Sequence, residues 1–166
     1  MSLTTRPSLE HAGSSNFQVK LLDGDGDRVE SLANEIGSFQ GSMAIKIDET
    51  AAYLLDVNAD GSWSIRFETR AAMAQSKAPV TLTGEGQKAT EFFELEKGLW
   101  IVALEHAGSS NFQVKILDGD GDVVESLANE IGDFQGSMAI KIDKTAAYLL
   151  DVNADGSWSI GFSLPD

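Results

Sequence analysis

The sequence predicts an all-β protein made of antiparallel β-sandwich, or jelly-roll, units. Many short segments alternate apolar and polar residues with a period of two, and turn residues separate them about every 8–12 residues. No segment shows the longer 3.6-residue period that helices connecting parallel strands would need. Most of the chain is also written twice, because residues 9–65 recur as residues 104–160.

The two copies of the repeat are nearly identical. Of 57 aligned pairs only four differ, which leaves 53 identical; the four are Leu21/Ile116, Arg28/Val123, Ser38/Asp133 and Glu49/Lys144. Three of these exchanges alter charge. Because an unpaired buried charge is costly, we expect those three positions to face solvent in both copies.

In the first copy the chain begins with a polar segment, Thr4–Pro7, at the place where the second copy has apolar Leu99–Val102. This segment is expected to be a polar substitute for a strand. Alternation then predicts strands at 17–21, 28–33 (with a bulge near Ser31), 43–47, 53–57 and 63–67. Turn residues occupy 11–16, 23–27, 34–37 and 58–61, and Gly61 suits a left-handed conformation.

Residues 68–78 are rich in alanine and polar residues and have no counterpart after the second copy, so they are expected to form a linker, with one or two helical turns at most. After them, 80–83, 87–95 and 99–104 read as three opening strands. The last is apolar on both faces and should be central in its sheet. The expected organisation is an incomplete β-sandwich repeat at 9–67, a linker at 68–78 and a complete repeat at 79–166.

The opening strands occur once, although two copies need them. They could complete the second copy directly or complete the first through the linker; the shorter connection favours the second copy. The other copy would present unpaired strand edges, which tend to pair with another chain. We therefore expect self-association by strand exchange or edge pairing, as a two-fold dimer.

Charge and composition exclude some partners. The net charge of −14 repels phosphate backbones and anionic membranes, so neither nucleic acid nor membrane is expected as a partner. The chain has no cysteine, hence no disulfide and no thiolate metal site. No apolar run approaches the ~20 residues of a membrane helix, and the first residues lack the apolar region of a signal peptide.

The order of motifs in the second copy is similar to that of bacterial pre-peptidase C-terminal-like domains. The motifs are Phe92–Leu95, Gly98, Trp100–Val102, Phe112–Asp118, Gly121, Ala147–Val152 and Trp158–Ile160. The family's usual Gly-Thr before the tyrosine is replaced here by Thr145-Ala-Ala. The resemblance implies a small jelly-roll sandwich that serves as a non-enzymatic accessory module of extracellular or cell-surface proteins. Because that family has no common catalytic residues, the resemblance assigns no catalytic residue to this chain.

Two acidic turns suggest an alternative, a calcium site. Alternating carboxylates in a turn can direct several hard oxygen ligands at one cation; the residues are Asp23, Asp25, Asp27, Asp118, Asp120 and Asp122. An EF-hand is excluded, because its sixth and twelfth positions hold Val123 and Asn129 in the second copy. A solvated hairpin turn, for which Asp and Gly are the preferred residues, explains the same sequence without a metal.

Other candidate sites are weaker. His11 and His106 stand close to serines, but they are too near them in sequence for a usual catalytic triad, and no nucleophile elbow is present. Trp63, Trp100 and Trp158 could stack on sugars; their alternation with apolar neighbours predicts core packing instead. We therefore expect a non-catalytic accessory or interaction module that binds itself, with protein or carbohydrate as a further ligand. The alternative is a calcium-dependent module that binds carbohydrate or another ligand.

Overall fold

The computed structural model describes residues 3–69 and 76–166, and the described residues form strands and turns without any helix. We call residues 3–69 the first unit and residues 76–166 the second unit. The first unit contains β1 (Leu3–Ala12), β2 (Asn16–Leu22), β3 (Arg28–Ile36), β4 (Phe39–Ser42), β5 (Ile45–Ile47), β6 (Leu54–Ala59) and β7 (Ser62–Thr69). The all-β antiparallel sandwich predicted from the sequence is confirmed.

The second unit contains ten strands. They are β8 (Ser76–Lys77), β9 (Val80–Glu85), β10 (Lys88–Ala89), β11 (Phe93–Leu95), β12 (Gly98–Ala107), β13 (Asn111–Leu117), β14 (Val123–Ile131), β15 (Phe134–Ile142), β16 (Ala146–Ala154) and β17 (Ser157–Ser163). Residues 3–69 and 76–166 contain no helix that is long and apolar enough to cross a membrane.

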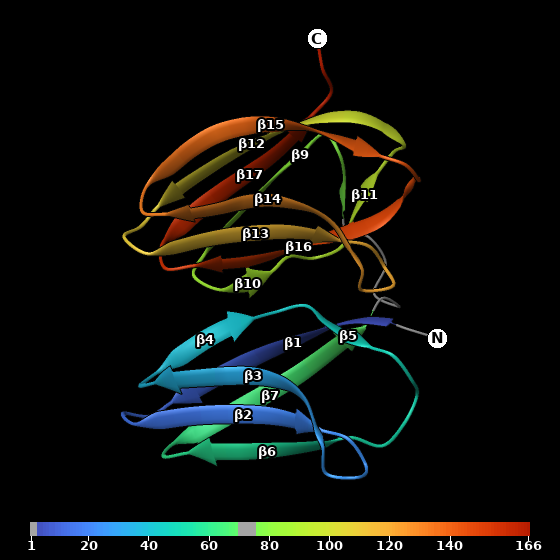
Figure 1. Ribbon diagram of the computed structural model, residues 1–166. Helices are drawn as coiled ribbons and strands as arrows, with labels where there is room; N and C mark the ends of the chain where they lie inside the picture. Colours follow the sequence, from blue (N-terminus) through green and yellow to red (C-terminus); the bar gives the residue numbers. More distant parts are fainter. Residues whose placement is uncertain (1–2, 70–75) are drawn as a thin grey trace.

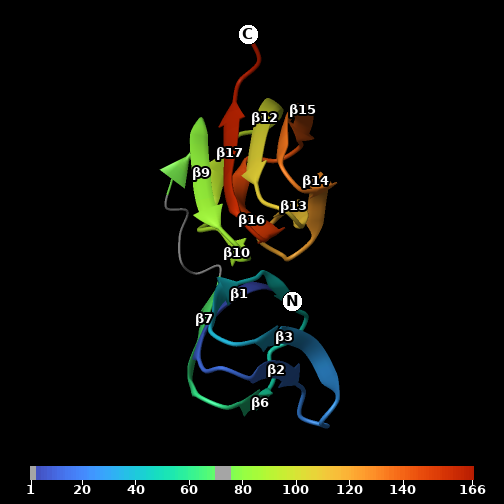
Figure 2. The ribbon, with the colours of Figure 1, turned by 90° about the vertical axis from the view of Figure 1, so that its left-hand side faces the viewer.

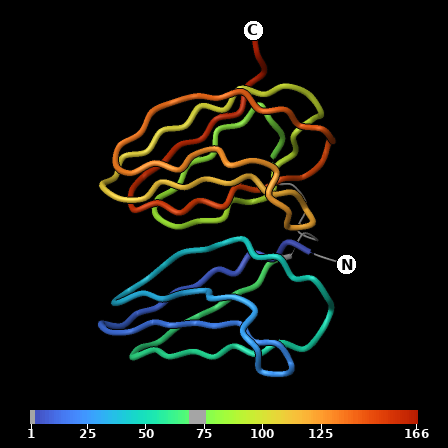
Figure 3. Tube along the Cα trace, in the orientation of Figure 1, coloured from blue at the N-terminus to red at the C-terminus, as the bar shows by residue number. Residues whose placement is uncertain are grey.

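Each unit is a sandwich of two sheets, and no sheet mixes strands from the two units. In the first unit, β1 pairs with β4, β5 and β7, and the facing sheet has the order β3-β2-β6. In the second, β15-β12-β17-β9 faces β14-β13-β16-β11-β8. The units lie one above the other (Figure 1), and their Cα traces follow the same course through the repeated residues (Figure 3).

The apolar faces that alternation predicts line the two cores. In the second unit they include Phe112, Val114, Ile160 and Phe162, all completely or almost completely buried. The first unit has a smaller core around Leu9, Phe17, Val19 and Leu21. The strand at 99–104 is central, between β15 and β17, as predicted.

The polar segment at the start of the chain does form a strand. β1 begins at Leu3 and occupies the register of β12, which begins 95 residues later at Gly98. The strand that pairs with β1 is interrupted. Whereas β12 pairs with one continuous strand, β15, β1 pairs with β4 and β5, which residues 43–44 separate. Pro7 has no N–H group to donate at this point of the ladder, which accounts for the break.

Other details of the sequence analysis are confirmed or corrected. The register of β2 against β3 shifts next to Ser31, as expected for a bulge. The predicted turn at 34–37 is wrong for Asn34–Ile36, which belong to β3, since the ladder continues opposite Asn16–Gln18. All residues at the three charge-altering positions are exposed, as predicted.

The opening strands complete the second unit. β9 pairs with β17, while β10 and β11 pair with β16, so the frame with the short connection is the one adopted. Of the predicted linker, Glu68 lies in β7 and Ser76–Lys77 form β8, a difference from the expected bounds. Residues 70–75, where helical turns were considered, lie outside the described residues.

Candidate interaction surface

The repeat supplies an internal comparison between a covered and an uncovered sandwich side. In the second unit β9 covers the outer edge of β17, and β10 and β11 cover the outer edge of β16. In the first unit the equivalent strands are β7 and β6, and within residues 3–69 and 76–166 no strand pairs with either of those edges. We call the side of the first unit formed by the outer edges of β6 and β7 the open side (Figure 2).

Identical side chains differ in burial between the two units because of these strands. Trp158, Phe162 and Leu149 are 3%, 2% and 0% exposed. Their twins Trp63, Phe67 and Leu54 are 49%, 40% and 60% exposed. The predicted core packing is therefore confirmed for Trp158 and Trp100 and wrong for Trp63. Trp63 lies on the expected face of its strand, but no described strand covers it.

The indole of Trp158 shows how a covering strand is recognised. It lies against Gly84 of β9 so closely that a Cβ at this position would overlap the ring. Its Nε1 donates a hydrogen bond to the carbonyl oxygen of Gly86, at 3.1 Å. A glycine opposite the tryptophan and a carbonyl two residues later thus fix the strand at this point.

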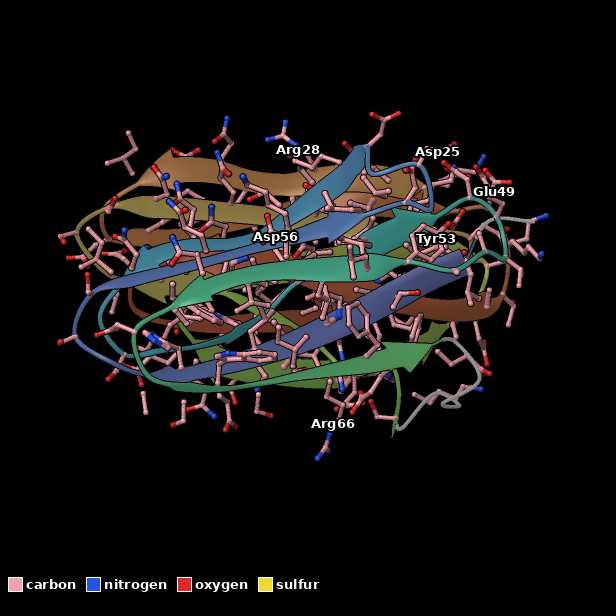
Figure 4. All side chains as sticks on the ribbon, turned by 90° about the horizontal axis from the view of Figure 1, so that it is seen from below. Asp25, Arg28, Glu49, Tyr53, Asp56 and Arg66 are labelled. Carbon is pink, nitrogen blue, oxygen red and sulfur yellow. The ribbon has the colours of Figure 1, made fainter. Side chains whose placement is uncertain are left out.

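One edge position differs between the units. Gly161 of β17 pairs with Thr81, and a Cβ at Gly161 would lie 3.3 Å from Thr81 Oγ1. The first unit has Arg66 at this position, exposed and pointing outward from β7 (Figure 4). A charged edge residue restricts which strands can pair there.

The two histidines belong to equivalent clusters that close the ends of the sandwiches. His11 Nδ1 donates to the carbonyl oxygen of Gly37 at 2.8 Å, and its ring stacks on Phe17 at 4.5 Å. Its Nε2 lies 3.2 Å from Asp60 Oδ1 without an aligned hydrogen bond. His106 repeats these contacts with Gly132, Phe112 and Asp155.

In both clusters the carboxylate lies between the histidine and the serine. Asp60 Oδ2 accepts hydrogen bonds from the N–H groups of Ser14 and Ser15 and from the Ser14 hydroxyl. The Ser14 N–H is the main reason that the pKa of Asp60 lies below its usual value. A hydrolytic triad needs the imidazole between serine and carboxylate, so that it can take the hydroxyl proton. Here the hydroxyl proton is directed at the carboxylate, an arrangement that stabilises turns.

The hairpin glycine next to this cluster corrects another prediction. Gly61 does not have the left-handed backbone expected for it, and its twin Gly156 has no positive φ either. They are required by close approach, because a Cβ would overlap the carbonyl oxygen of Ala12 or Ala107. Such contacts come from two distant turns meeting, and only the recurrence of Asp-Gly with His-Ala-Gly-Ser-Ser could have indicated them.

The two acidic turns have the same internal structure. Asp23 Oδ1 accepts the N–H groups of Asp25 and Asp27, and Asp118 Oδ1 accepts those of Asp120 and Asp122. Gly26 and Gly121 have positive φ. No three histidine, aspartate or glutamate side chains in the described residues are placed to hold a metal ion. Calcium binding at these turns stays a prediction.

The surroundings of the two turns differ. The turn at 118–122 lies against the first unit: Lys46 Nζ is 2.7 Å from Asp122 Oδ1, and the Thr4 hydroxyl donates to the carbonyl oxygen of Asp118 at 2.9 Å. Lys46 has its pKa raised chiefly by the hydrogen bond to Asp122. In the first unit the equivalent residues 24–27 are exposed.

Further contacts between the units involve β1 and β4. Arg6 is buried and donates to Glu68 of its own sheet and to Glu91 of the second unit, the latter at 2.7 Å. The Ser42 hydroxyl accepts the Ala89 N–H at 2.8 Å. Asp151 Oδ1 accepts the Ala44 N–H at 3.4 Å, and burial raises the pKa of Asp151 to about 6.

No known protein-family model matches the chain, and no match to a curated protein was found. The open side, the paired clusters and the acidic turns therefore have to be interpreted from their own geometry.

Proposed function

We propose that the chain is a non-catalytic accessory or interaction module that self-associates through the open side of its first unit. The observation that carries this proposal is the difference in burial between identical residues, above all Trp63 and Trp158. Fully burying a large apolar side chain is worth about 1.5–3 kcal/mol, so Leu54, Trp63 and Phe67 together leave a few kcal/mol of burial unused. The unpaired backbone groups of β6 and β7 add to this surface.

Stoichiometry favours edge pairing over strand exchange. Every chain has one set of opening strands and two sandwiches that can accept it. If one chain gives its strands to the first unit of another, its own second unit loses them, so the number of open sandwiches stays the same. Two first units that pair edge to edge cover both open sides, and this arrangement has the two-fold symmetry that is commonest among soluble dimers.

One register of β7 against the β7 of a second copy suits the sequence. Antiparallel pairing centred on Ile65 places Arg66 opposite Ser64 and Phe67 opposite Trp63 of the other copy. In this register the half-exposed indole of Trp63 has to turn away from the position that Trp158 takes against Gly84. Aromatic residues that face each other across strands stabilise a sheet by roughly 0.2–1 kcal/mol per pair. The two Arg66 side chains do not oppose one another in this register.

Sedimentation equilibrium over a range of chain concentrations tests the proposal. We expect the mass to rise from the 17.8 kDa of one chain towards that of two. Replacing Leu54 and Phe67 with lysine should shift this rise to at least tenfold higher concentration. Ile36→Lys is the matched control, because Ile36 is an exposed apolar residue remote from the open side, at the end of β3. A constant 17.8 kDa mass up to millimolar concentration, or an equal effect of the control, would overturn the proposal.

The His-Asp-Ser arrangement supports a non-catalytic role, and so does the resemblance of the motif order to pre-peptidase C-terminal-like domains, which also suggests an extracellular setting. The alternative is calcium-dependent binding of carbohydrate or another ligand. It rests on the two acidic turns and is separated from the main proposal by a calcium titration.

A further inference from the structure

We infer that the open side of the first unit is an acceptor site for a strand supplied by another polypeptide, with the pattern apolar-x-apolar-x-Gly. This inference rests on the proposed function, since both need an accessible open side, and it adds the identity of the ligand class. The second unit shows the same site filled. There Val80, Leu82 and Gly84 of β9 pair with Phe162, Ile160 and Trp158.

The residues that receive β9 are present in the first unit. Phe162, Ile160 and Trp158 correspond to Phe67, Ile65 and Trp63, and the strand between Ser157 and Phe162 differs from Ser62–Phe67 only at Gly161/Arg66. Val80 and Leu82 pack against the core of the second unit. The same alternation in a bound strand would cover the side chains that are exposed on the first unit.

Glycine is the most selective requirement. Because the indole of Trp158 occupies the space in which a Cβ of residue 84 would lie, any larger residue would have to displace the ring. The carbonyl of Gly86 adds a hydrogen bond to Nε1 of the indole. Trp63 has the same indole and the same Nε1–H donor, and it is half-exposed on the open side.

Arg66 makes the first unit distinct from its twin. Thr81 lies opposite Gly161, and its hydroxyl is close to the place where any side chain at position 161 would begin. Arg66 would therefore crowd a threonine at that position of the bound strand. A smaller residue there should improve binding to the first unit, which gives the two sites different preferences.

The chain has no second donor segment with which to cover the open side of its first unit. The one donor segment pairs with β16 and β17 of the second unit through its strands β9, β10 and β11. The same segment also bonds to the first unit, because the Ala89 N–H donates to the Ser42 hydroxyl. A strand that is part of the same unit has a high effective concentration, so a free peptide will not displace it there. The first unit is the acceptor that remains for an outside strand.

A synthetic peptide of residues 79–95, labelled for fluorescence anisotropy, is the probe, and the full chain is the receptor. We expect saturable binding of one peptide per chain, with a blue shift of tryptophan emission that Trp63→Phe removes. The Gly84→Val peptide should bind at least tenfold more weakly, and the Thr81→Ala peptide a few-fold more tightly. The peptide should also return a self-associated chain to a monomer.

An extended chain is the decisive control. Since Leu3 has the register of Gly98, a second copy of residues 79–97 placed directly before Leu3 supplies the missing strands to the first unit. This chain should bind no peptide. Equal binding by the extended chain, equal binding of the Gly84→Val peptide, or no binding at millimolar peptide would each overturn the inference.

The experiment also distinguishes the inference from the proposed function. Self-association without peptide binding would leave the proposed function in place and remove the acceptor site. Peptide binding by a chain that stays monomeric at every concentration would support the acceptor site and remove self-association.

Discussion

Asp151 is the residue at which the contact between the units makes its clearest thermodynamic prediction. It lies on β16, pairs with Ala89 and Lys115, and accepts a hydrogen bond from Ala44 of the first unit. Burial raises its pKa to about 6, against an ordinary 3.8; Ala44 and Lys115 act in the opposite direction and Glu30 of the first unit adds to the rise. The replacement Asp151→Asn keeps the side-chain oxygen that accepts the Ala44 N–H and removes the charge.

The sign and size of the effect follow from proton binding. Between pH 4 and pH 6 the folded chain holds a proton on Asp151 that the unfolded chain releases, so the free energy of unfolding falls as pH rises through this window. A difference of about 2 pH units at 1.36 kcal/mol each corresponds to roughly 3 kcal/mol. At pH 8 we therefore expect Asp151→Asn to be more stable than the wild type by up to about 3 kcal/mol, and at pH 4 by no more than about 0.6 kcal/mol.

Urea unfolding followed by tryptophan fluorescence, at pH 4, 6 and 8 and at low chain concentration, measures this difference. The twin variant Asp56→Asn is a matched control, since Asp56 has the same sequence neighbours but is exposed on β6 (Figure 4). Its free energy of unfolding should change by no more than about 0.5 kcal/mol at any pH. The reasoning would be refuted if Asp151→Asn gave no stabilisation at pH 8, or if Asp56→Asn gave the same gain.

Three further predictions concern the acidic turns, the hairpin glycines and the contact between units. Millimolar calcium should leave the thermal midpoint unchanged; a rise of several degrees that Asp25→Asn abolishes would instead establish the calcium-dependent alternative. Gly156→Ala should lower the free energy of unfolding by at least about 3 kcal/mol in chemical denaturation, because its Cβ would overlap the Ala107 carbonyl; a loss below 1 kcal/mol would contradict this. Arg6→Ala should cost about 1–2 kcal/mol and speed hydrogen exchange in β1 and β10, because it removes the bonds from the buried guanidinium to Glu68 and to the half-exposed Glu91; unchanged exchange would refute the assignment.

Sequence patterns predicted the strands well because the side chains of a half-buried strand alternate between core and solvent, so apolar and polar residues alternate in the sequence. Phe17–Leu21 and Phe112–Ile116 are strands, with their apolar residues buried in the expected alternation. The comparison of the two copies also predicted the exposure of the charge-altering positions, since a position occupied by Glu49 in one copy and Lys144 in the other faces solvent in both. These signals are local, and they hold in both units.

The parts that could not be predicted depend on contacts between distant segments. Trp63 and Trp158 have identical neighbours in sequence, so no local pattern could separate a half-exposed indole from a buried one. Arg6 pairs with Glu91 and Asp122 pairs with Lys46, in each case across the two units. The conformation of Gly61 was misjudged for the same reason, because its constraint is the carbonyl of Ala12 on another strand.

The position of the opening strands explains why the two copies took different environments despite nearly identical sequences. Residues 87–91 pair with β16 on one side and contact Ser42 and Arg6 of the first unit on the other. Moving the segment to the first unit would expose the apolar edge of β16 and β17 and would also break these contacts between the units. The frame with the short connection is thus favoured by the packing of both units as well as by chain entropy. With the segment in the second unit, β1 contacts that unit through the polar face of Thr4 and Arg6. The apolar residues of β6 and β7 then remain accessible to a strand from outside the chain.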